Sequence, residues 1–301
     1  MTKEEFFERF QYDINRDKVG DSDSGSVYKA YDTQSYRFVA LKITKINAGN
    51  QHENGNNDNE SDNTYILPTH PNIAGYEFIY VFEQPTGLFE FAIMPFYQLG
   101  NLKQLLEKFN LKPEDKASIG IQVLDGIEFL HQHGIVHKNL KPENILIDIE
   151  NSVDGTVYTA KISDSSTQSR NSSSRYSQYQ SPEQLRNRDL TPNTDLWSWA
   201  VICYKLLTGN DLFETNSQKG EIGIMMSILD EDITPKLEKL PYTWKVALYE
   251  TLKRDANQRV QTAKEIKNII LNTPAMSEYG SYQPATDADD YIAEEEEELE
   301  V

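Results

Sequence analysis

Residues 137–144, His-Lys-Asn-Leu-Lys-Pro-Glu-Asn, are the stretch on which the interpretation of this sequence depends. The stretch is mostly polar and follows an expected helix, residues 114–133, that Gly134 ends. Asn139 occupies the middle of the stretch, where a carboxylate would make chemical sense. An amide oxygen accepts a hydrogen bond, but an amide cannot take up a proton at neutral pH. The stretch therefore raises the question of what a chain does with an amide at this position, since it cannot hold a proton.

The composition is that of a water-soluble chain. Of the 301 residues, 38% are hydrophobic and 26% are charged. No apolar run reaches the roughly 18 residues that a membrane span needs, and residues 1–5 contain no apolar core of a secretory signal. The single cysteine, Cys203, lies in an apolar helical pattern and has no partner for a disulfide within one chain. These features predict a cytoplasmic, reducing compartment and no membrane span.

The net charge of −19 is unevenly distributed along the chain. Residues 273–301 hold ten of the Asp and Glu residues and no Lys or Arg, which leaves −9 on the rest of the chain. A like-charge block of this kind repels itself, so residues 273–301 are expected to form an acidic disordered tail. Because the remaining body is also acidic, nucleic acid is not an expected partner.

The hydrophobic pattern changes from strand to helix along the chain. Residues 12–97 are mostly typical of strands, with period-two alternation around Val39–Ile43 and an Asn-rich loop at residues 47–63. From residue 100 onwards the apolar residues follow helical spacing. Residues 194–208 are apolar on nearly every side, which predicts a fully buried helix. The sequence therefore predicts an α+β fold with a strand-rich first third and a helical remainder.

A glycine-containing turn and a buried lysine indicate a phosphate site. Gly20 and Gly25 would let the backbone approach a phosphate closely, although two such glycines also fit an ordinary hairpin turn. Lys42 ends the strand pattern Val39-Ala-Leu-Lys. A lysine on the inward face of a strand is costly to desolvate unless an anion meets it, and triphosphate oxygens would serve.

The order of these motifs resembles the protein kinase family, specifically its Ser/Thr branch of bacteria and eukaryotes. The motifs are the glycine loop, Val39–Lys42, His137–Asn144, Ile162–Asp164, Ser181–Glu183 and Asp195–Ser198. The resemblance covers residues 12–272. It implies a bilobal fold, with an N-terminal extension at 1–11, an N-lobe and hinge at 12–97, and a C-lobe at 98–272.

The resemblance also implies a nucleotide site for ATP with Mg²⁺ or Mn²⁺. Lys42 would pair with the α- and β-phosphates, Lys141 would lie near the transferred phosphate, and Asn144 and Asp164 would bind the metal. The remaining residues implied to contact the nucleotide are Gly20, Gly25, Val27, Ala40, Met94, Pro95, Tyr97 and Leu146. Glu183 and Arg259 would form a buried pair, Asp195 would hold the backbone of the catalytic loop, and His137 would be a packed anchor.

Four departures from the family pattern suggest impaired phosphotransfer. Asn139 replaces the catalytic Asp, a loss on the order of 10² to 10⁴ in rate. Asp164 is followed by Ser165-Ser166 in place of Phe-Gly. The glutamate partner of Lys42 is hard to find, since Asn63 occupies its counted position; either Glu60 reaches the lysine or the partner is absent, and absence is favoured.

The fourth departure combines two changes. Ser22 and Ser24 weaken the glycine loop, and Lys138 replaces an Arg that could grip a phosphorylated activation loop.

Three hypotheses follow. The leading one is a pseudokinase that binds ATP and metal and acts as a scaffold or allosteric regulator. The alternative is an active or residually active Ser/Thr kinase, in which Asn139 is native or an engineered Asp-to-Asn change. A small-molecule phosphotransferase of kinase-like fold is disfavoured, because the Ser-Pro-Glu segment and the buried helix after it are typical of a peptide-substrate platform. The identity of a protein partner or substrate stays open.

Overall fold

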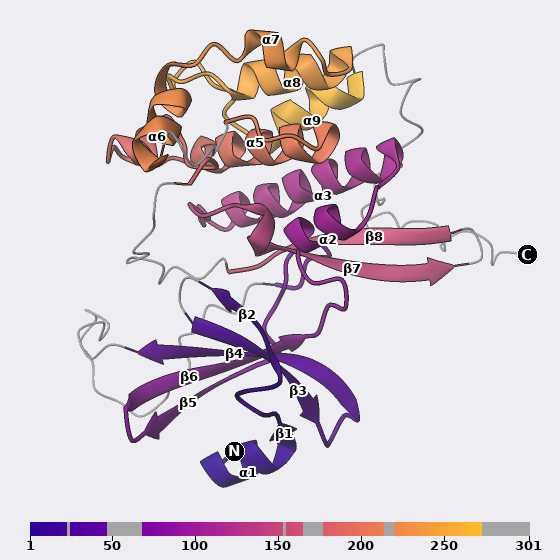
Figure 1. The fold of residues 1–301 in the computed structure, drawn as a ribbon, viewed down its shortest axis with the longest axis vertical. Coiled ribbons are helices and arrows are strands. Elements are labelled where there is room, and N and C mark those ends of the chain that lie inside the picture. Colours follow the sequence, from indigo (N-terminus) through magenta and orange to yellow (C-terminus); the bar gives the residue numbers. More distant parts are fainter. Residues whose placement is uncertain (23–24, 47–67, 153–154, 165–176, 214–219, 273–301) are drawn as a thin grey trace, which may run out of the picture.

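The computed structural model describes residues 1–22, 25–46, 68–152, 155–164, 177–213 and 220–272. Figure 1 shows two lobes, a curled antiparallel sheet from the first third of the chain and a larger helical lobe from the rest. The prediction of a bilobal α+β fold is confirmed. Among the described helices, none has the length and apolar character of a membrane span. The expected acidic tail, residues 273–301, lies outside the described residues.

The small lobe is built on a sheet with strand order β1-β3-β4-β6-β5, in which β2 also pairs with β3. The strands are β1 (Phe10–Gln11), β2 (Lys18–Ser22), β3 (Gly25–Asp32), β4 (Arg37–Ile46), β5 (Phe78–Gln84) and β6 (Gly87–Pro95). The period-two pattern at Val39–Ile43 lies in the centre of β4, as predicted. Val39 and Leu41 face the core of this lobe, and Ala40 and Lys42 on the opposite face are buried as well.

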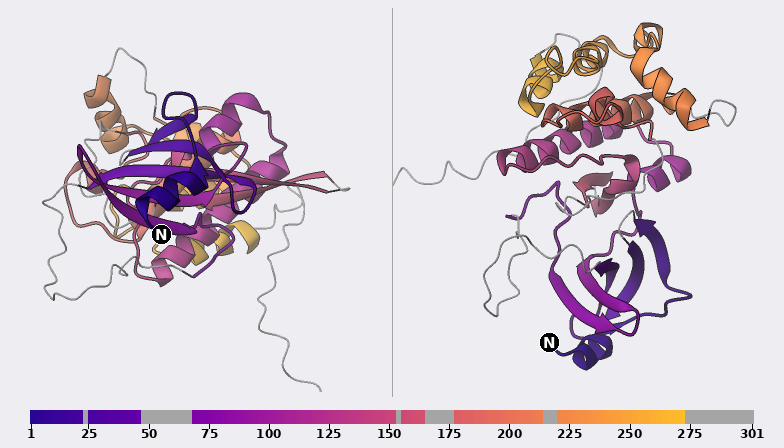
Figure 2. Two further views of the ribbon diagram at one scale, coloured as in Figure 1. Left: turned by 90° about the horizontal axis from the view of Figure 1, so that it is seen from below. Right: turned by 90° about the vertical axis from the view of Figure 1, so that its left-hand side faces the viewer.

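The first eleven residues are packed into the small lobe. Helix α1 (Lys3–Arg9) begins with a capping box between Thr2 and Glu5. Figure 1 places α1 against the sheet on the side away from the helical lobe, and Figure 2 shows the same arrangement from two more directions. Phe6 has no exposed surface, and its ring lies 5.3 Å from the ring of Phe91 on β6. The aromatic rings of α1 thus complete the core beneath the sheet.

In its described part, the large lobe is helical apart from a two-stranded sheet. Its described elements are α2 (Leu102–Lys108), α3 (Pro113–Gln132), the 3₁₀ turn η1 (Pro142–Asn144), β7 (Ile145–Ser152), β8 (Gly155–Ile162), α4 (Pro182–Leu185), α5 (Asn193–Thr208), α6 (Gly220–Asp230), α7 (Thr234–Leu237), α8 (Tyr242–Thr251) and α9 (Ala263–Asn272). Helix α5 is buried along nearly its whole length, as its apolar sequence predicts, and Gly209 ends it in the left-handed conformation at φ 77°.

Residues 70–74 attach the two lobes to each other. The amide of Ile162, at the end of β8, donates to the carbonyl of Asn72 at 2.8 Å, and the amide of Ala74 donates back to Ile162 at 2.8 Å. The buried side chain of Asn72 donates to the carbonyl of Ala160 at 2.9 Å. This short ladder fixes the chain that leads into β5 against the strand that leads to Asp164. The sheet face carrying Lys42 is therefore held opposite Asp164, which follows β8.

Candidate nucleotide-binding site

Asp195 holds the backbone of the loop that contains Asn139. Its Oδ2 accepts from the amide of His137 at 2.8 Å, and its Oδ1 accepts from the amide of Lys138 at 2.7 Å. His131 Nε2 lies 2.9 Å from the same carboxylate. Lys138 has a left-handed φ of 65°, which is costly for a lysine and is maintained by these bonds. The architectural role expected for Asp195 is confirmed.

His137 anchors the loop through both ring nitrogens. Nε2 lies 2.8 Å from the carbonyl oxygen of Ser163, and Nδ1 lies 3.2 Å from the amide of Asn139. The first contact places one ring nitrogen against a backbone carbonyl, and the second places the other against a backbone amide. Both ring nitrogens of His137 are therefore engaged by backbone groups, as expected for a packed anchor.

The side chain of Asn144 is oriented by the backbone of Asn139. Asn144 Nδ2 donates to the carbonyl oxygen of Asn139 at 2.8 Å, which leaves its Oδ1 as the atom able to meet a ligand. The carbonyl of Asn144 accepts from the amide of Ser163 at 2.9 Å, so the segment before Asp164 is tied to this turn. Lys141 is half-buried in the same loop, and its carbonyl accepts from the amide of Asn144 at 2.9 Å.

Lys42 reaches across from the small lobe to Asp164. The lysine is buried on β4, and its Nζ forms an ion pair with Oδ1 of Asp164, which has a left-handed φ of 64°. Burial lowers the pKa of Lys42. The acidic groups around it, Tyr76 and Asp164 foremost, raise the pKa by more than burial lowers it, so the net shift is upward. The lysine therefore stays charged in a low-dielectric setting, which suits the binding of an anion.

The available ligands fit a Mg²⁺ site that is shared with substrate phosphates better than a metal site built from protein ligands alone. Asp164 and Asn144 supply carboxylate and amide oxygens, the hard ligands that Mg²⁺ prefers. In the described part of the chain, no group of three or more His, Cys, Asp or Glu is placed to hold a metal. Mg²⁺ is commonly held by one or two protein ligands together with substrate phosphates, so these two residues are sufficient.

The expected purine-binding residues come from both lobes. Ala40 on β4 lies opposite Met94 on β6, and both are buried. Val27 on β3 lies opposite Lys42. Leu146 on β7 forms an isolated bridge with Asn101, just after the chain crosses between the lobes. Pro95 and Tyr97, the expected hinge residues, are half-buried at the end of β6.

Gly25 has a packing role that does not require a phosphate. A Cβ at this position would lie 2.1 Å from the carbonyl oxygen of Ile43 on β4, so only glycine fits beneath the hairpin. Gly20 has open space around the corresponding point and pairs with Val27 across β2 and β3. Ser24 lies outside the described residues, as do Glu60, Asn63 and residues 165–166.

Two side chains beside Lys42 are absent from the sequence-based prediction. Tyr76 is half-buried, and burial raises its pKa more than the charge of Lys42 lowers it. Glu90 on β6 is half-buried too, and burial raises its pKa more than the charge of Lys42 lowers it, so the net shift is upward. Glu90 could have been found from the sequence, because it alternates with Ala92 and Met94. Tyr76 precedes β5 in an irregular segment and carries no such signal.

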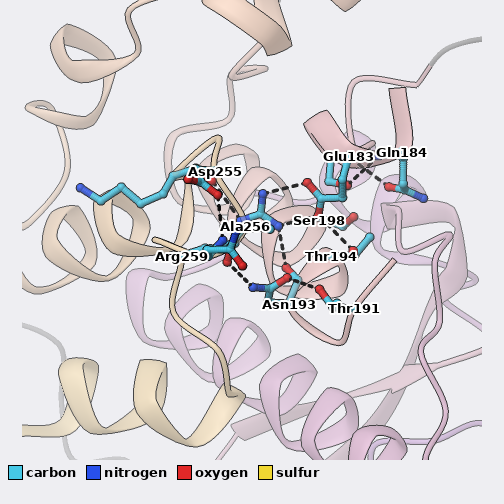
Figure 3. A network of polar contacts seen from close by, with 12 residues as sticks. Glu183, Gln184, Thr191, Asn193, Thr194, Ser198, Asp255, Ala256 and Arg259 are labelled. Carbon is cyan, nitrogen blue, oxygen red and sulfur yellow. Dashed lines mark hydrogen bonds and ion pairs between the residues drawn. The ribbon is translucent and has the colours of Figure 1, made fainter. Parts of the chain in front are cut away.

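A buried ion pair between Glu183 and Arg259 holds α4 in place. Arg259 donates through Nη1 and Nη2 to the two oxygens of Glu183 at 2.7 and 3.0 Å, as the sequence predicts. Thr194 Oγ1 donates to the same carboxylate at 3.0 Å, and Arg259 also donates to the carbonyl of Asn193 at 3.0 Å. Figure 3 shows this network between the start of α5 and the turn before α9. It fixes α4, whose Gln184 donates to the carbonyl of Lys138 at 2.6 Å.

Comparison with known proteins identifies the family. The model of the protein kinase domain matches residues 14–270. The chain belongs to the protein kinase family. It is 30% identical over 253 residues to a probable serine/threonine-protein kinase of Clostridium perfringens, covering 82% of this chain and 36% of that relative. It is 26% identical over 272 residues to the serine/threonine-protein kinase PrkC of Bacillus subtilis, covering 89% of this chain and 38% of PrkC.

These relatives confirm the resemblance to the bacterial Ser/Thr branch. A probable kinase PknB of Lactococcus lactis is 24% identical over 270 residues, covering 87% of this chain and 42% of that protein. The chain thus spans about two fifths of the length of these curated relatives.

Proposed function

We propose that this kinase-fold chain binds ATP with Mg²⁺ or Mn²⁺ and transfers phosphate poorly or not at all, so that it acts as a scaffold or allosteric regulator. The observation that carries the proposal is the pairing of Lys42 with Asp164 beside a loop that holds Asn139. Lys42 would bind the phosphates, and Asn144 and Asp164 would hold the metal, which would neutralise phosphate charge when bound. Asn139 can accept a hydrogen bond from a hydroxyl group but cannot remove its proton.

The arrangement of these groups supports binding separately from catalysis. The phosphate and metal positions depend on Lys42, Asn144 and Asp164; Lys42 and Asp164 pair with each other, and the backbone of Asn139 orients Asn144. The proton-accepting position is the one that lacks a suitable group, because His137 beside it is fully engaged by the backbone. A lost base costs on the order of 10² to 10⁴ in rate, which is about 3 to 5 kcal/mol of barrier.

Thermal denaturation with and without nucleotide tests the binding half. ATP and Mg²⁺ at 100 times the dissociation constant should stabilise the chain by about 2.7 kcal/mol, which corresponds to roughly 5 to 11 °C for a domain of this size. EDTA should reduce the shift, and Asp164→Asn should remove its dependence on Mg²⁺. If no ATP concentration shifted the melting temperature, the nucleotide-binding half of the proposal would be wrong and only the scaffold half would remain.

The second candidate is an active or residually active Ser/Thr kinase. The specific observation in its favour is that the relatives named above are serine/threonine-protein kinases. Lys141 is retained, and a loose transition state for phosphoryl transfer asks little of a base. Transfer of labelled phosphate from ATP to a basic protein or to the chain itself would favour this candidate. If only the Asn139→Asp variant transferred labelled phosphate, and the wild type did not, the missing carboxylate would be the limiting defect.

A further inference from the structure

The ammonium group of Lys42 is surrounded by three acidic groups from different parts of the chain. Asp164 forms the ion pair described above, and the hydroxyl of Tyr76 and the ammonium of Lys42 shift each other's pKa through their charges. The third group is Glu90, whose charge acts on Lys42 and Tyr76. Asp164 is also the expected metal ligand, whereas Tyr76 and Glu90 have no role in the site as described so far.

The register of the sheet places Glu90 next to Lys42. In the β4–β6 pair, Lys42 lies opposite Ala92, and Thr44 lies opposite Glu90. Side chains alternate along each strand, so Lys42 and Glu90 project from the same face as diagonal neighbours. Diagonal neighbours of this kind are about 7 to 8 Å apart at the backbone, which is within reach of two long side chains. A half-buried carboxylate is costly without a nearby cation, and Lys42 is the charged group that acts on Glu90.

Asp164 cannot serve Lys42 fully once a metal is bound. A carboxylate bound to Mg²⁺ has much of its charge neutralised by the ion, so its attraction for the lysine falls. Lys42 then needs another anionic partner if its ammonium is to stay directed at the phosphates. Asn63, at the counted position of the helix glutamate, carries no charge. Glu90 lies in the described part of the chain, and it is not an expected ligand of the metal, so its full charge can act on Lys42.

We propose that Glu90 is the positioning residue for Lys42, a carboxylate on strand β6 that holds the ammonium toward the nucleotide phosphates when Asp164 is engaged by the metal. The inference rests on the proposed nucleotide-binding function. It assigns to the sheet the task for which the sequence offers no clear helix glutamate. A positioning residue of this kind predicts that the loss of Glu90 matters more with Mg²⁺ than without it.

The test compares ATP dissociation constants of the wild type and Glu90→Gln by titration calorimetry, in Mg²⁺ and in EDTA. Glu90→Gln keeps the shape and removes the charge. It should weaken binding about fivefold in Mg²⁺, equivalent to roughly 1 kcal/mol, and less than twofold in EDTA. Glu90→Asp should recover part of the loss. Glu83→Gln, an exposed carboxylate on the neighbouring strand β5, is the matched control and should behave as the wild type.

A double-mutant cycle of Glu90→Gln and Lys42→Met on the thermal midpoint, without nucleotide, provides a second readout. Non-additive shifts are expected, and they would support the pair even if the wild type failed to bind ATP, an outcome that removes the proposed function alone. Additive shifts would overturn the inference. Equal losses of ATP affinity for Glu90→Gln in Mg²⁺ and in EDTA would also overturn it. The inference would fail as well if a Glu60→Gln variant lost ATP affinity and Glu90→Gln did not.

Discussion

The buried pair of Glu183 and Arg259 gives a prediction that can be worked out from the structure. The side chain of Arg259 has 0% exposed surface, and that of Glu183 has 7%. Glu183→Gln keeps the shape but leaves the arginine charge buried without a counter-charge. Removing one partner of a buried pair costs about 3 to 5 kcal/mol. For a domain of this size that corresponds to a fall in Tm of roughly 6 to 20 °C.

Urea denaturation at pH 7 measures this cost, with Glu238→Gln as the control. Glu238 forms an ion pair with Lys245 at 3.1 Å but is 60% exposed, and its loss should change stability by less than about 1 kcal/mol. Replacing both Glu183 and Arg259 with Met should recover much of the loss, because no unpaired charge remains. If Glu183→Gln lies within about 1 kcal/mol of the wild type, the pair does not hold the segment after the site.

The same variant makes a prediction about pH. Burial raises the pKa of Glu183, but the hydrogen bonds and charge of Arg259 lower it, and the net shift is downward. A lowered carboxyl pKa contributes stability above the ordinary pKa of about 4.3, and this contribution is lost as the pH falls through the folded-state pKa. The difference between the wild type and Glu183→Gln should therefore shrink below about pH 4. A constant difference across this range would contradict the assignment.

Three further predictions concern the packing of α1, the Arg9–Asp32 ion pair and the buried cysteine of α5. Phe6→Ala should lower stability by about 3 to 5 kcal/mol in urea denaturation, since Phe6 is fully buried under the sheet; a loss below about 1 kcal/mol would show that α1 is dispensable. Arg9 donates to Asp32 at 2.8 and 2.9 Å and lowers the carboxyl pKa well below its usual range, so the contribution of this pair should persist at pH 5, decline only at lower pH, and be absent at every pH in Asp32→Asn. Burial raises the thiol pKa of Cys203, so a thiol reagent should label it in urea but not in the native state; rapid native labelling would contradict its burial in α5.

Much of the fold could be predicted from local patterns, and the residues involved explain why. The alternation at Val39–Ile43 and the mostly apolar run at 194–208 indicate burial directly, and they lie in β4 and α5. The packing of α1 could not be predicted, because seven residues are too few for a helical period to stand out. Its stability comes from rings that are distant in sequence, such as Phe91.

The site was predictable to the extent that its residues belong to motifs. Asp195, His137 and the Glu183–Arg259 pair follow the family pattern, and the structure gives each a partner. Tyr76 and Glu90 belong to no motif, and their importance depends on the distance to Lys42 in the folded chain. The pairing of β4 with β6 places Glu90 near Lys42, whereas Tyr76 lies in the irregular segment before β5 and carries no periodic signal.

The most direct test of the account measures ATP binding and phosphate transfer on the same preparation of the wild-type chain. Calorimetry with ATP and Mg²⁺ gives the first quantity, and labelled ATP with a protein acceptor gives the second, with Asn139→Asp measured in parallel. The account predicts saturable, Mg²⁺-dependent binding with transfer at background. Transfer by the wild type at the 1 to 100 per second that is usual for kinases, or the absence of any ATP binding, would contradict it.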